Sequence, residues 1–139
     1  MKALTIQEPY ATFIMQGLKK IETRSWKTNY RGEIYIHAGK SKQFLKTIDN
    51  EQVLSLVKQN NMNYGKIICK TELVDCIYMT EEFIEYIKIN YPEEYKLAIY
   101  KVGRYAWVLK NTKKLNTKIP TKGKLNIWTY NKNEVKYGR

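Results

Sequence analysis

The stretch from Lys66 to Tyr78 most strongly constrains the fold, because it is rich in β-branched residues and long for one strand. It predicts a strand that bends or carries a β-bulge. Shorter strands and about three helices are expected around it, in the order β-α-β-β-α-β-α-β-β. This order predicts an α+β fold, mainly β, in which a curled mixed sheet packs against the helices. The expected strands are Lys2–Ile6, Lys20–Trp26, Glu33–Ala38, Lys66–Tyr78, Tyr105–Leu109 and Leu125–Tyr130. The first expected helix begins at about Pro9, and the second begins after Ser41 and restarts at Asn50. The third begins after Thr80 and ends at Tyr91-Pro92.

The 139 residues are the usual size of one domain, and the chain has no internal repeat or linker. We therefore expect a single domain over residues 1–139. No apolar run approaches the roughly 20 residues that span a bilayer. Gln7, Glu8 and Pro9 interrupt the first apolar stretch, which does not resemble a signal peptide. The predicted location is cytoplasmic, without membrane association, and a monomer is favoured.

Cys69 and Cys76 are the two cysteines, and on one strand their odd spacing would point them to opposite faces. A mutual disulfide is therefore not expected, and both are interpreted as buried structural thiols. With two cysteines, one histidine and no C-x-x-C, the chain could assemble a tetrahedral zinc site only by borrowing carboxylates. We predict no metal and no cofactor.

The net charge of +12 is unevenly distributed. Residues 1–70 carry 12 basic and 5 acidic side chains. Residues 71–100 carry 2 basic and 7 acidic side chains, and residues 101–139 carry 11 basic side chains and 1 acidic side chain. Such segregation predicts a basic surface that attracts polyanions, with an acidic region elsewhere. A solvated lysine-rich surface without a partner is the alternative.

Several segments, in order, resemble the ASCH domain family. Gly17–Arg24 matches its G-x-K-x-x-E-x-R signature, and the resemblance extends over most of the chain. The matching segments are Leu4–Ala11 (LTIQEPYA), Gly17–Arg24 (GLKKIETR), Ser25-Trp26, Tyr30–Gly32 (YRG), Ile36–Ala38 (IHA), Gly103–Leu109 and Lys122–Leu125. The chain is most similar to the small stand-alone members of bacteria and phages. This resemblance implies a PUA-like mixed β-barrel (pseudobarrel), a cleft beside the first helix and the signature strand, and binding of RNA or another single-stranded nucleic acid.

Lys19, Glu22 and Arg24 are the centre of the predicted site. Glu22 and Arg24 are two residues apart on a strand, so both project from one face. Arg offers a planar fork for phosphate or a base edge, Lys a mobile charge, and Glu an acceptor for an exocyclic amine. A surface ion-pair cluster without function is the alternative.

Other candidates surround this signature. Tyr10 and Trp26 are preferred as stacking rings, although most aromatic side chains in a small barrel are core. Gln7 could recognise a ligand amide or cap the helix. His37 is interpreted as a structural, hydrogen-bonded histidine, with acid–base chemistry as the alternative. The predicted nucleic-acid-binding set is Gln7, Tyr10, Lys19, Glu22, Arg24, Trp26, Tyr30 and Arg31, and diffuse phosphate contacts are expected from Lys110, Lys113, Lys114, Lys118, Lys122 and Lys124.

Two other functions stay open beside the favoured binding module. The first is a hydrolase acting on RNA or a modified nucleoside, with Lys19 and Glu22 as catalytic residues. In relatives that act on a modified cytidine, a Thr occupies the position of Glu22, and Thr23 is expected on the opposite strand face, which argues against that chemistry here. The second is a protein-interaction adaptor that uses the acidic segment 71–100.

Overall fold

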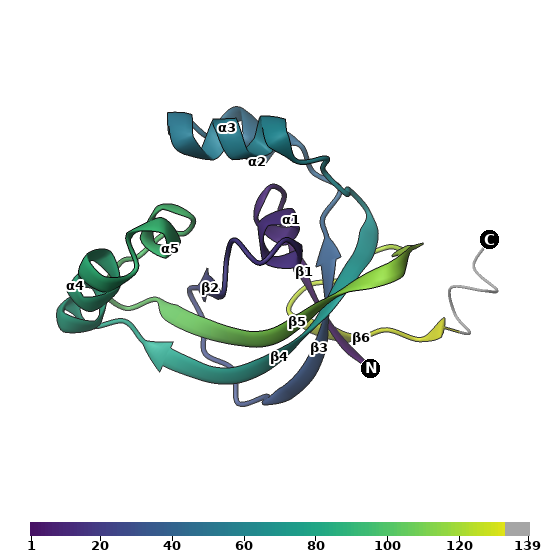
Figure 1. Ribbon diagram of the computed structural model, residues 1–139. Coiled ribbons are helices and arrows are strands. Elements are labelled where there is room, and N and C mark those ends of the chain that lie inside the picture. Colours follow the sequence, from purple (N-terminus) through teal and green to yellow (C-terminus); the bar gives the residue numbers. More distant parts are fainter. Residues whose placement is uncertain (133–139) are drawn as a thin grey trace.

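The computed structural model describes residues 1–132; residues 133–139, which the predicted domain includes, lie outside the described part. Its centre is a six-stranded, curled sheet with the strand order β2-β5-β4-β3-β1-β6 (Figure 1). The strands are β1 (Lys2–Ile6), β2 (Ile21–Arg24), β3 (Gly32–Ala38), β4 (Lys66–Tyr78), β5 (Tyr105–Pro120) and β6 (Ile127–Thr129). The helices in the described part are α1 (Tyr10–Met15), α2 (Gln43–Lys46), α3 (Glu51–Gln59), α4 (Glu81–Asn90) and α5 (Pro92–Lys96).

The long β4–β5 ribbon gives the sheet its curl. Its antiparallel register shifts at three places along β4, as a series of β-bulges would produce. Bulges bend a strand and increase its twist, so this ribbon wraps into half of a barrel. β1 and β3 pair in parallel, whereas the other neighbouring strands pair antiparallel. The mixed, mainly β fold and the irregular β4 predicted from the sequence are confirmed.

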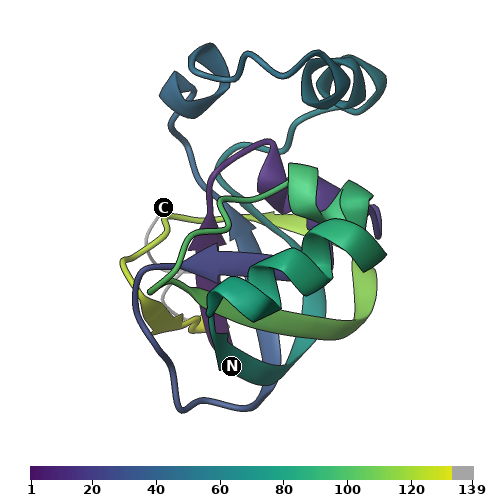
Figure 2. The same ribbon diagram turned by 90° about the vertical axis from the view of Figure 1, so that its left-hand side faces the viewer.

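Helix α1 occupies the concave side of the sheet, and α2 and α3 lie beyond it (Figures 1 and 2). Every α1 residue after Tyr10 is buried. Ile14 packs with Leu4 and Trp107 in the main core, whereas Phe13 turns the other way, toward Val53 of α3. Layers of structure therefore enclose α1 on two sides.

A buried carboxylate ties the loop before β4 to α1. Glu8 is fully buried, and its Oε1 accepts a hydrogen bond from Thr12 N at 2.8 Å. Its Oε2 accepts from Thr12 Oγ1 at 2.5 Å and from Asn63 N at 2.6 Å. Several donors thus satisfy the carboxylate in its buried position. These contacts fix the start of α1, which carries Tyr10 to the site described below.

The caps predicted at Asn50 and Thr80 are confirmed, whereas the one predicted at Ser41 is wrong, because Lys42 occupies the N-cap of α2 and makes no side-chain cap hydrogen bond. Asn50 accepts from the backbone of Gln52 and Val53 at the start of α3, and Thr80 accepts from Phe83 N at the start of α4. Gly17, at φ +79, adopts the left-handed conformation expected after a helix.

The structure departs from the prediction in several elements, and β2 is shorter than expected, because it ends at Arg24 and not at Trp26. Strand β5 continues from Leu109 through the basic connection to Pro120, with Asn111 at φ +56 where the register is irregular. The last strand begins at Ile127, not at Leu125, whose side chain is 89% exposed. Five short helices form in the described part: the expected restart at Asn50 divides the second region into α2 and α3, whereas α5, which starts at Pro92, was not expected.

The two cysteines are free thiols in different surroundings. Cys69 is buried, and desolvation raises its pKa to about 12, so it stays a protonated core thiol. Cys76 is only half-buried. The interpretation as a buried structural thiol is therefore confirmed for Cys69 and holds only partly for Cys76.

Candidate nucleotide-binding site

Strand β2 brings the signature side chains together. Arg24 Nε donates to Glu22 Oε2 at 3.1 Å, as their shared strand face predicts. Lys19 Nζ lies 3.6 Å from Glu22 Oε1, so Glu22 forms ion pairs with both cations. Arg24 Nη2 also donates to the carbonyl of Thr5 on β1 at 2.7 Å, which links β2 to the opposite part of the sheet. The predicted cluster exists and is only partly exposed.

Lys19 is buried, with only 1% of its surface exposed. Its ammonium donates to the carbonyl oxygens of Ile21 at 2.6 Å and Leu97 at 2.9 Å. Burial lowers the pKa of Lys19, and the nearby Glu22 carboxylate opposes that shift. The interpretation of this lysine as a mobile charge in a turn is wrong, because the chain segment after α5 covers it.

Helix α5 is joined to the start of β2 by a second contact. The Glu94 carboxylate accepts hydrogen bonds from Lys20 N at 2.9 and 3.0 Å and from Ile21 N at 3.2 Å. Lys19 reaches in the other direction, to the Leu97 carbonyl. These reciprocal bonds hold residues 97–99 as a wall beside the signature.

An open cavity of about 320 Å³ lies against this cluster. Its walls combine two aromatic rings, several cations, one carboxylate and short polar side chains. Its lining residues are Thr5, Ile6, Gln7, Tyr10, Lys19, Glu22, Thr23, Arg24, Phe44, Leu97, Ala98, Ile99, Arg104, Lys124, Leu125 and Asn126. Its volume lies at the lower end of the roughly 300–1,000 Å³ typical of small-ligand sites, which suits one nucleotide unit and not a duplex.

The aromatic side of the cavity comes from two helices. Tyr10 of α1 and Phe44 of α2 meet edge to face, with ring centroids 5.4 Å apart. Lys19 Nζ lies 5.3 Å from the Tyr10 ring centroid, a cation–π contact. Burial and the Glu22 charge raise the pKa of Tyr10, so its hydroxyl stays protonated at neutral pH.

Five of the eight predicted binding residues line this cavity: Gln7, Tyr10, Lys19, Glu22 and Arg24. The other three lie outside its lining. Trp26 packs edge to face on the core residue Trp107, with centroids 4.6 Å apart. Tyr30 donates to the carbonyl of Glu33. Arg31 donates to the carbonyls of Thr28 and Tyr30, and its Nη2 lies 3.8 Å from Asp75 Oδ1.

Sequence reasoning missed Arg104, which stands directly before β5. Its Nη2 donates to the carbonyl and Oγ1 of Thr23 at 3.0 and 3.4 Å. Thr23 was expected on the face of β2 opposite to the site, but it also lines the cavity. The family-like segment from Gly103 was the signal, but it was interpreted as a closing strand only.

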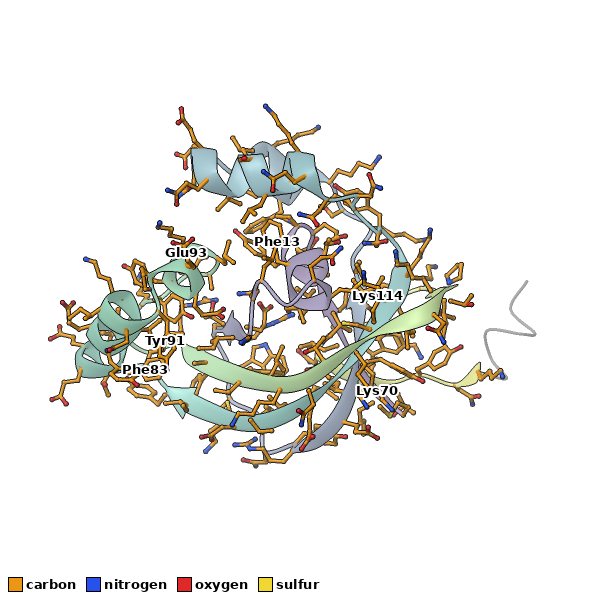
Figure 3. The ribbon with its side chains drawn as sticks, in the orientation of Figure 1. Phe13, Lys70, Phe83, Tyr91, Glu93 and Lys114 are labelled. Carbon is orange, nitrogen blue, oxygen red and sulfur yellow. The ribbon has the colours of Figure 1, made fainter. Side chains whose placement is uncertain are left out.

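Of the six lysines predicted as diffuse phosphate contacts, all within the described residues, Lys124 alone lines the cavity. Lys110, Lys113, Lys114 and Lys118 lie along β5. Figure 3 shows Lys114 on the part of β5 away from α4, where it bonds Gln16 at 3.4 Å. These lysines extend the positive surface but do not enter the cavity.

His37 positions the segment that carries Lys124. Its Nε2 pairs with the Thr121 carbonyl at 2.8 Å, and its Nδ1 with Thr5 Oγ1 at 3.1 Å. Trp128 Nε1 donates to the same Thr5 hydroxyl at 3.1 Å. The interpretation of His37 as structural and hydrogen-bonded is confirmed, and through these bonds it fixes residues 121–126 against the cavity.

Replacing His37 with Gln is expected to flatten the acid side of the stability profile. Burial lowers the pKa of His37, with the Thr121 carbonyl opposing and Lys40 adding to the shift. The unfolded chain, with a pKa of about 6.5, then binds more protons than the folded one, so folding stability falls as the pH drops below about 6.5. Urea unfolding between pH 7 and 5 should show a smaller loss for His37→Gln; parallel profiles would exclude this contribution.

A second, more apolar hollow of about 670 Å³ lies between α4 and the β2–β5 edge. Phe83 and Tyr91, labelled in Figure 3, belong to its wall. Of the eight predicted binding residues, which all lie in the described part, only Lys19 borders it, and Lys19 is buried. We therefore take the cavity beside Glu22 and Arg24 as the candidate site.

Within residues 1–132, no group of three or more His, Cys, Asp or Glu side chains is arranged to hold a metal ion. No helix of the same part is long and apolar enough to cross a membrane.

A curled, mixed half-barrel with a helix in its concave side is the fold of an ASCH/PUA-like domain. The chain belongs to the ASCH domain family, whose model matches residues 4–119. The crystal structure of ASCH from Zymomonas mobilis has the same fold, with a TM-score of 0.58 and 13% identity over 97% of this chain and 90% of that one. The crystal structure of a serine-to-alanine mutant of that protein matches with a TM-score of 0.51 and 14% sequence identity. This match covers 86% of this chain and 72% of that one.

Two curated relatives are Activating signal cointegrator 1 from Homo sapiens and from Mus musculus. They are 24% and 23% identical to this chain over alignments 132 positions long, which cover 90% of this chain. The match spans only 21% of the length of each relative. What those larger proteins do as a whole is therefore not transferred to this chain.

Proposed function

We propose that this protein binds single-stranded nucleic acid, RNA in the first instance, and that the cavity beside β2 receives one nucleotide of the strand. The observation that carries the proposal is the pairing of an aromatic wall with a cationic wall in one open cavity. Tyr10 and Phe44 form the first, and Arg24, Arg104 and Lys124 supply the second. A nucleotide has one part suited to each wall: a flat base that can stack on the aromatic rings and a phosphate that can bind the cations.

The polar groups between these walls suit a base edge. The Glu22 carboxylate, which pairs with Lys19 and Arg24, has oxygens that can accept hydrogen bonds from a base edge. Gln7 adds an amide that can both donate and accept. Stacking on an aromatic ring contributes on the order of 1–3 kcal/mol per base, so the base and the phosphate could both be bound here.

The basic surface outside the cavity supports a strand and not an isolated nucleotide. Lysines of β5 continue the positive charge along the ribbon. The acidic segment forms α4 and α5 on another side, facing the viewer in Figure 2. A polyanion would therefore be oriented toward the β5 side, as electrostatic steering predicts.

Binding of a short single-stranded RNA should weaken steeply with salt. Three phosphate contacts from Arg24, Arg104 and Lys124 give a slope of log affinity against log salt near −2, or about 20-fold between 50 and 200 mM. Lys124→Gln should reduce the slope by about 0.7, because Lys124 is exposed and its loss leaves the fold unchanged. Fluorescence anisotropy measures both quantities.

Lys58→Gln is the matched control, since Lys58 is exposed on α3 and does not line the cavity. It removes the same charge and should leave the slope unchanged. Absence of RNA binding by the wild type at low salt would refute the proposal. Identical slopes for Lys124→Gln and Lys58→Gln would refute the position of the site.

The hydrolase alternative has less support from the geometry. A catalytic lysine must reach the reacting atoms, whereas Lys19 is 1% exposed and its ammonium bonds two carbonyls and pairs with Glu22. Turnover of RNA or of a modified nucleoside that Glu22→Gln abolishes would reverse this preference.

A further inference from the structure

The cations around the cavity differ in how many hydrogen bonds they have left to give. An ammonium has three N–H donors. Two of those of Lys19 are taken by the Ile21 and Leu97 carbonyls, and Glu22 forms an ion pair with the same ammonium at 3.6 Å. Because only 1% of Lys19 is exposed, its ammonium is closed off from a ligand. It holds the wall of the site without contacting what the site binds.

Arg104, unlike Lys19, keeps hydrogen-bond donors that no described residue accepts. Its Nη2 is anchored on Thr23, which fixes the plane of the guanidinium. Its Nε is buried and has no hydrogen-bond partner among the described residues. Nor does any carboxylate of residues 1–132 form an ion pair with Arg104, in contrast to Arg24 and Lys19. Because Nε is buried, a ligand in the cavity cannot reach it; Nη1, which likewise has no hydrogen-bond partner among the described residues, is the guanidinium nitrogen left to donate.

The backbone holds Arg104 in place before any ligand arrives. Its carbonyl accepts from Met79 N at 2.9 Å, and its N donates to the Lys101 carbonyl at 3.1 Å. Gly103, at φ +94, makes the turn that delivers Arg104 to the start of β5. The side chain thus loses little freedom when it binds, which favours affinity.

The charge around the cavity identifies the ligand group. Among the described residues of the lining, Glu22 is the one acidic side chain, and Lys19 and Arg24 already neutralise it. Arg104 and the exposed Lys124 then leave the cavity with excess positive charge. Arginine suits phosphate better than a neutral carbonyl, because its planar N–H groups form charge-assisted hydrogen bonds with phosphate oxygens.

We infer that Arg104 is the principal phosphate-binding residue of the cavity, and that the site therefore takes nucleotides and phosphodiester strands in preference to free nucleosides. This inference rests on the proposed function and assigns its ligand class. Lys19, the signature lysine, is a positioning residue in this account.

The test compares a nucleoside with its 5′-monophosphate. Isothermal titration of adenosine, cytidine and their monophosphates should show the wild type preferring the phosphorylated form at least about tenfold, as charge-assisted hydrogen bonds predict. Arg104→Gln should lose about tenfold for the monophosphates and change nucleoside affinity less than about twofold. Arg104→Lys keeps the charge but not the planar fork of N–H groups, so its affinity for the monophosphates should lie between those of the wild type and Arg104→Gln. Lys58→Gln is the charge control, and urea midpoints establish that each variant is folded.

Equal loss of nucleoside and monophosphate affinity in Arg104→Gln would overturn the inference, because the residue would then act on the base or only on the fold. Wild-type affinity of Arg104→Gln for the monophosphates would overturn it as well. In both cases single-stranded RNA binding by the wild type would survive, so the proposed function would stand. Failure of the wild type to bind RNA at all is the separate result that removes both.

Discussion

Replacing Lys19 with Met is expected to destabilise the protein by roughly 3 kcal/mol, the lower end of the ~3–5 kcal/mol seen when one partner of a buried ion pair is removed. The amine bonds two buried carbonyls, and Met leaves both without a donor. Glu22 keeps its ion pair with Arg24, which limits the loss. Urea unfolding monitored by tryptophan fluorescence measures the change.

The adjacent Lys20→Met is the matched control. Lys20 is exposed, and the backbone N through which it binds Glu94 survives the substitution. A surface change of this kind usually alters stability by no more than about 0.5 kcal/mol. If the two variants lose equally little stability, Lys19 does not hold the 97–99 wall in the way described.

Gly123→Ala is expected to lower both stability and RNA affinity. A Cβ atom at this position would lie 2.5 Å from Thr5 Oγ1 and 2.7 Å from the His37 ring. Neither neighbour can yield easily, since they hydrogen-bond each other and His37 is buried. Overpacking of this kind typically costs about 1–3 kcal/mol. The segment would have to move away, and the cavity would lose the wall made by Lys124, Leu125 and Asn126.

The expected fall in RNA affinity is about tenfold, because an aligned contact to a charged group contributes on the order of 1.5–3 kcal/mol. Gly17→Ala is the comparison. It places a Cβ in open space at φ +79, so it strains the backbone without moving any cavity wall. Stability should fall in both variants but affinity only in Gly123→Ala. A similar loss of affinity in both would show that general destabilisation, and not the wall, determines binding.

The sequence predicted those elements whose pattern is local. β1 and β4 have the predicted bounds, because dense β-branched or alternating residues specify a strand without help from distant contacts. The second half of β5 was missed because its lysines, asparagines and threonines show no apolar alternation. It becomes a strand by pairing with β4, a tertiary effect. Pro92 was interpreted as a stop, although it starts α5.

The same division applies to the site. The Glu22–Arg24 pair follows from i, i+2 spacing on a strand, and the structure has it. The burial of Lys19 does not follow from the sequence, because its acceptor on Leu97 is 78 residues away. Arg104 was missed for the same reason, since its place beside Thr23 depends on the β2–β5 pairing.

The most direct test of the cavity as the nucleotide site is an NMR titration with a short single-stranded RNA. The signals to follow are the Arg104 and Arg24 Nε–H groups, the Gln7 side-chain amide and the backbone amides of residues 97–99 and 124–126. We predict that these signals shift together and saturate at one RNA concentration, while those of α3 do not move. Shifts confined to the lysines of β5, or to the hollow beside Phe83 and Tyr91, would contradict the account.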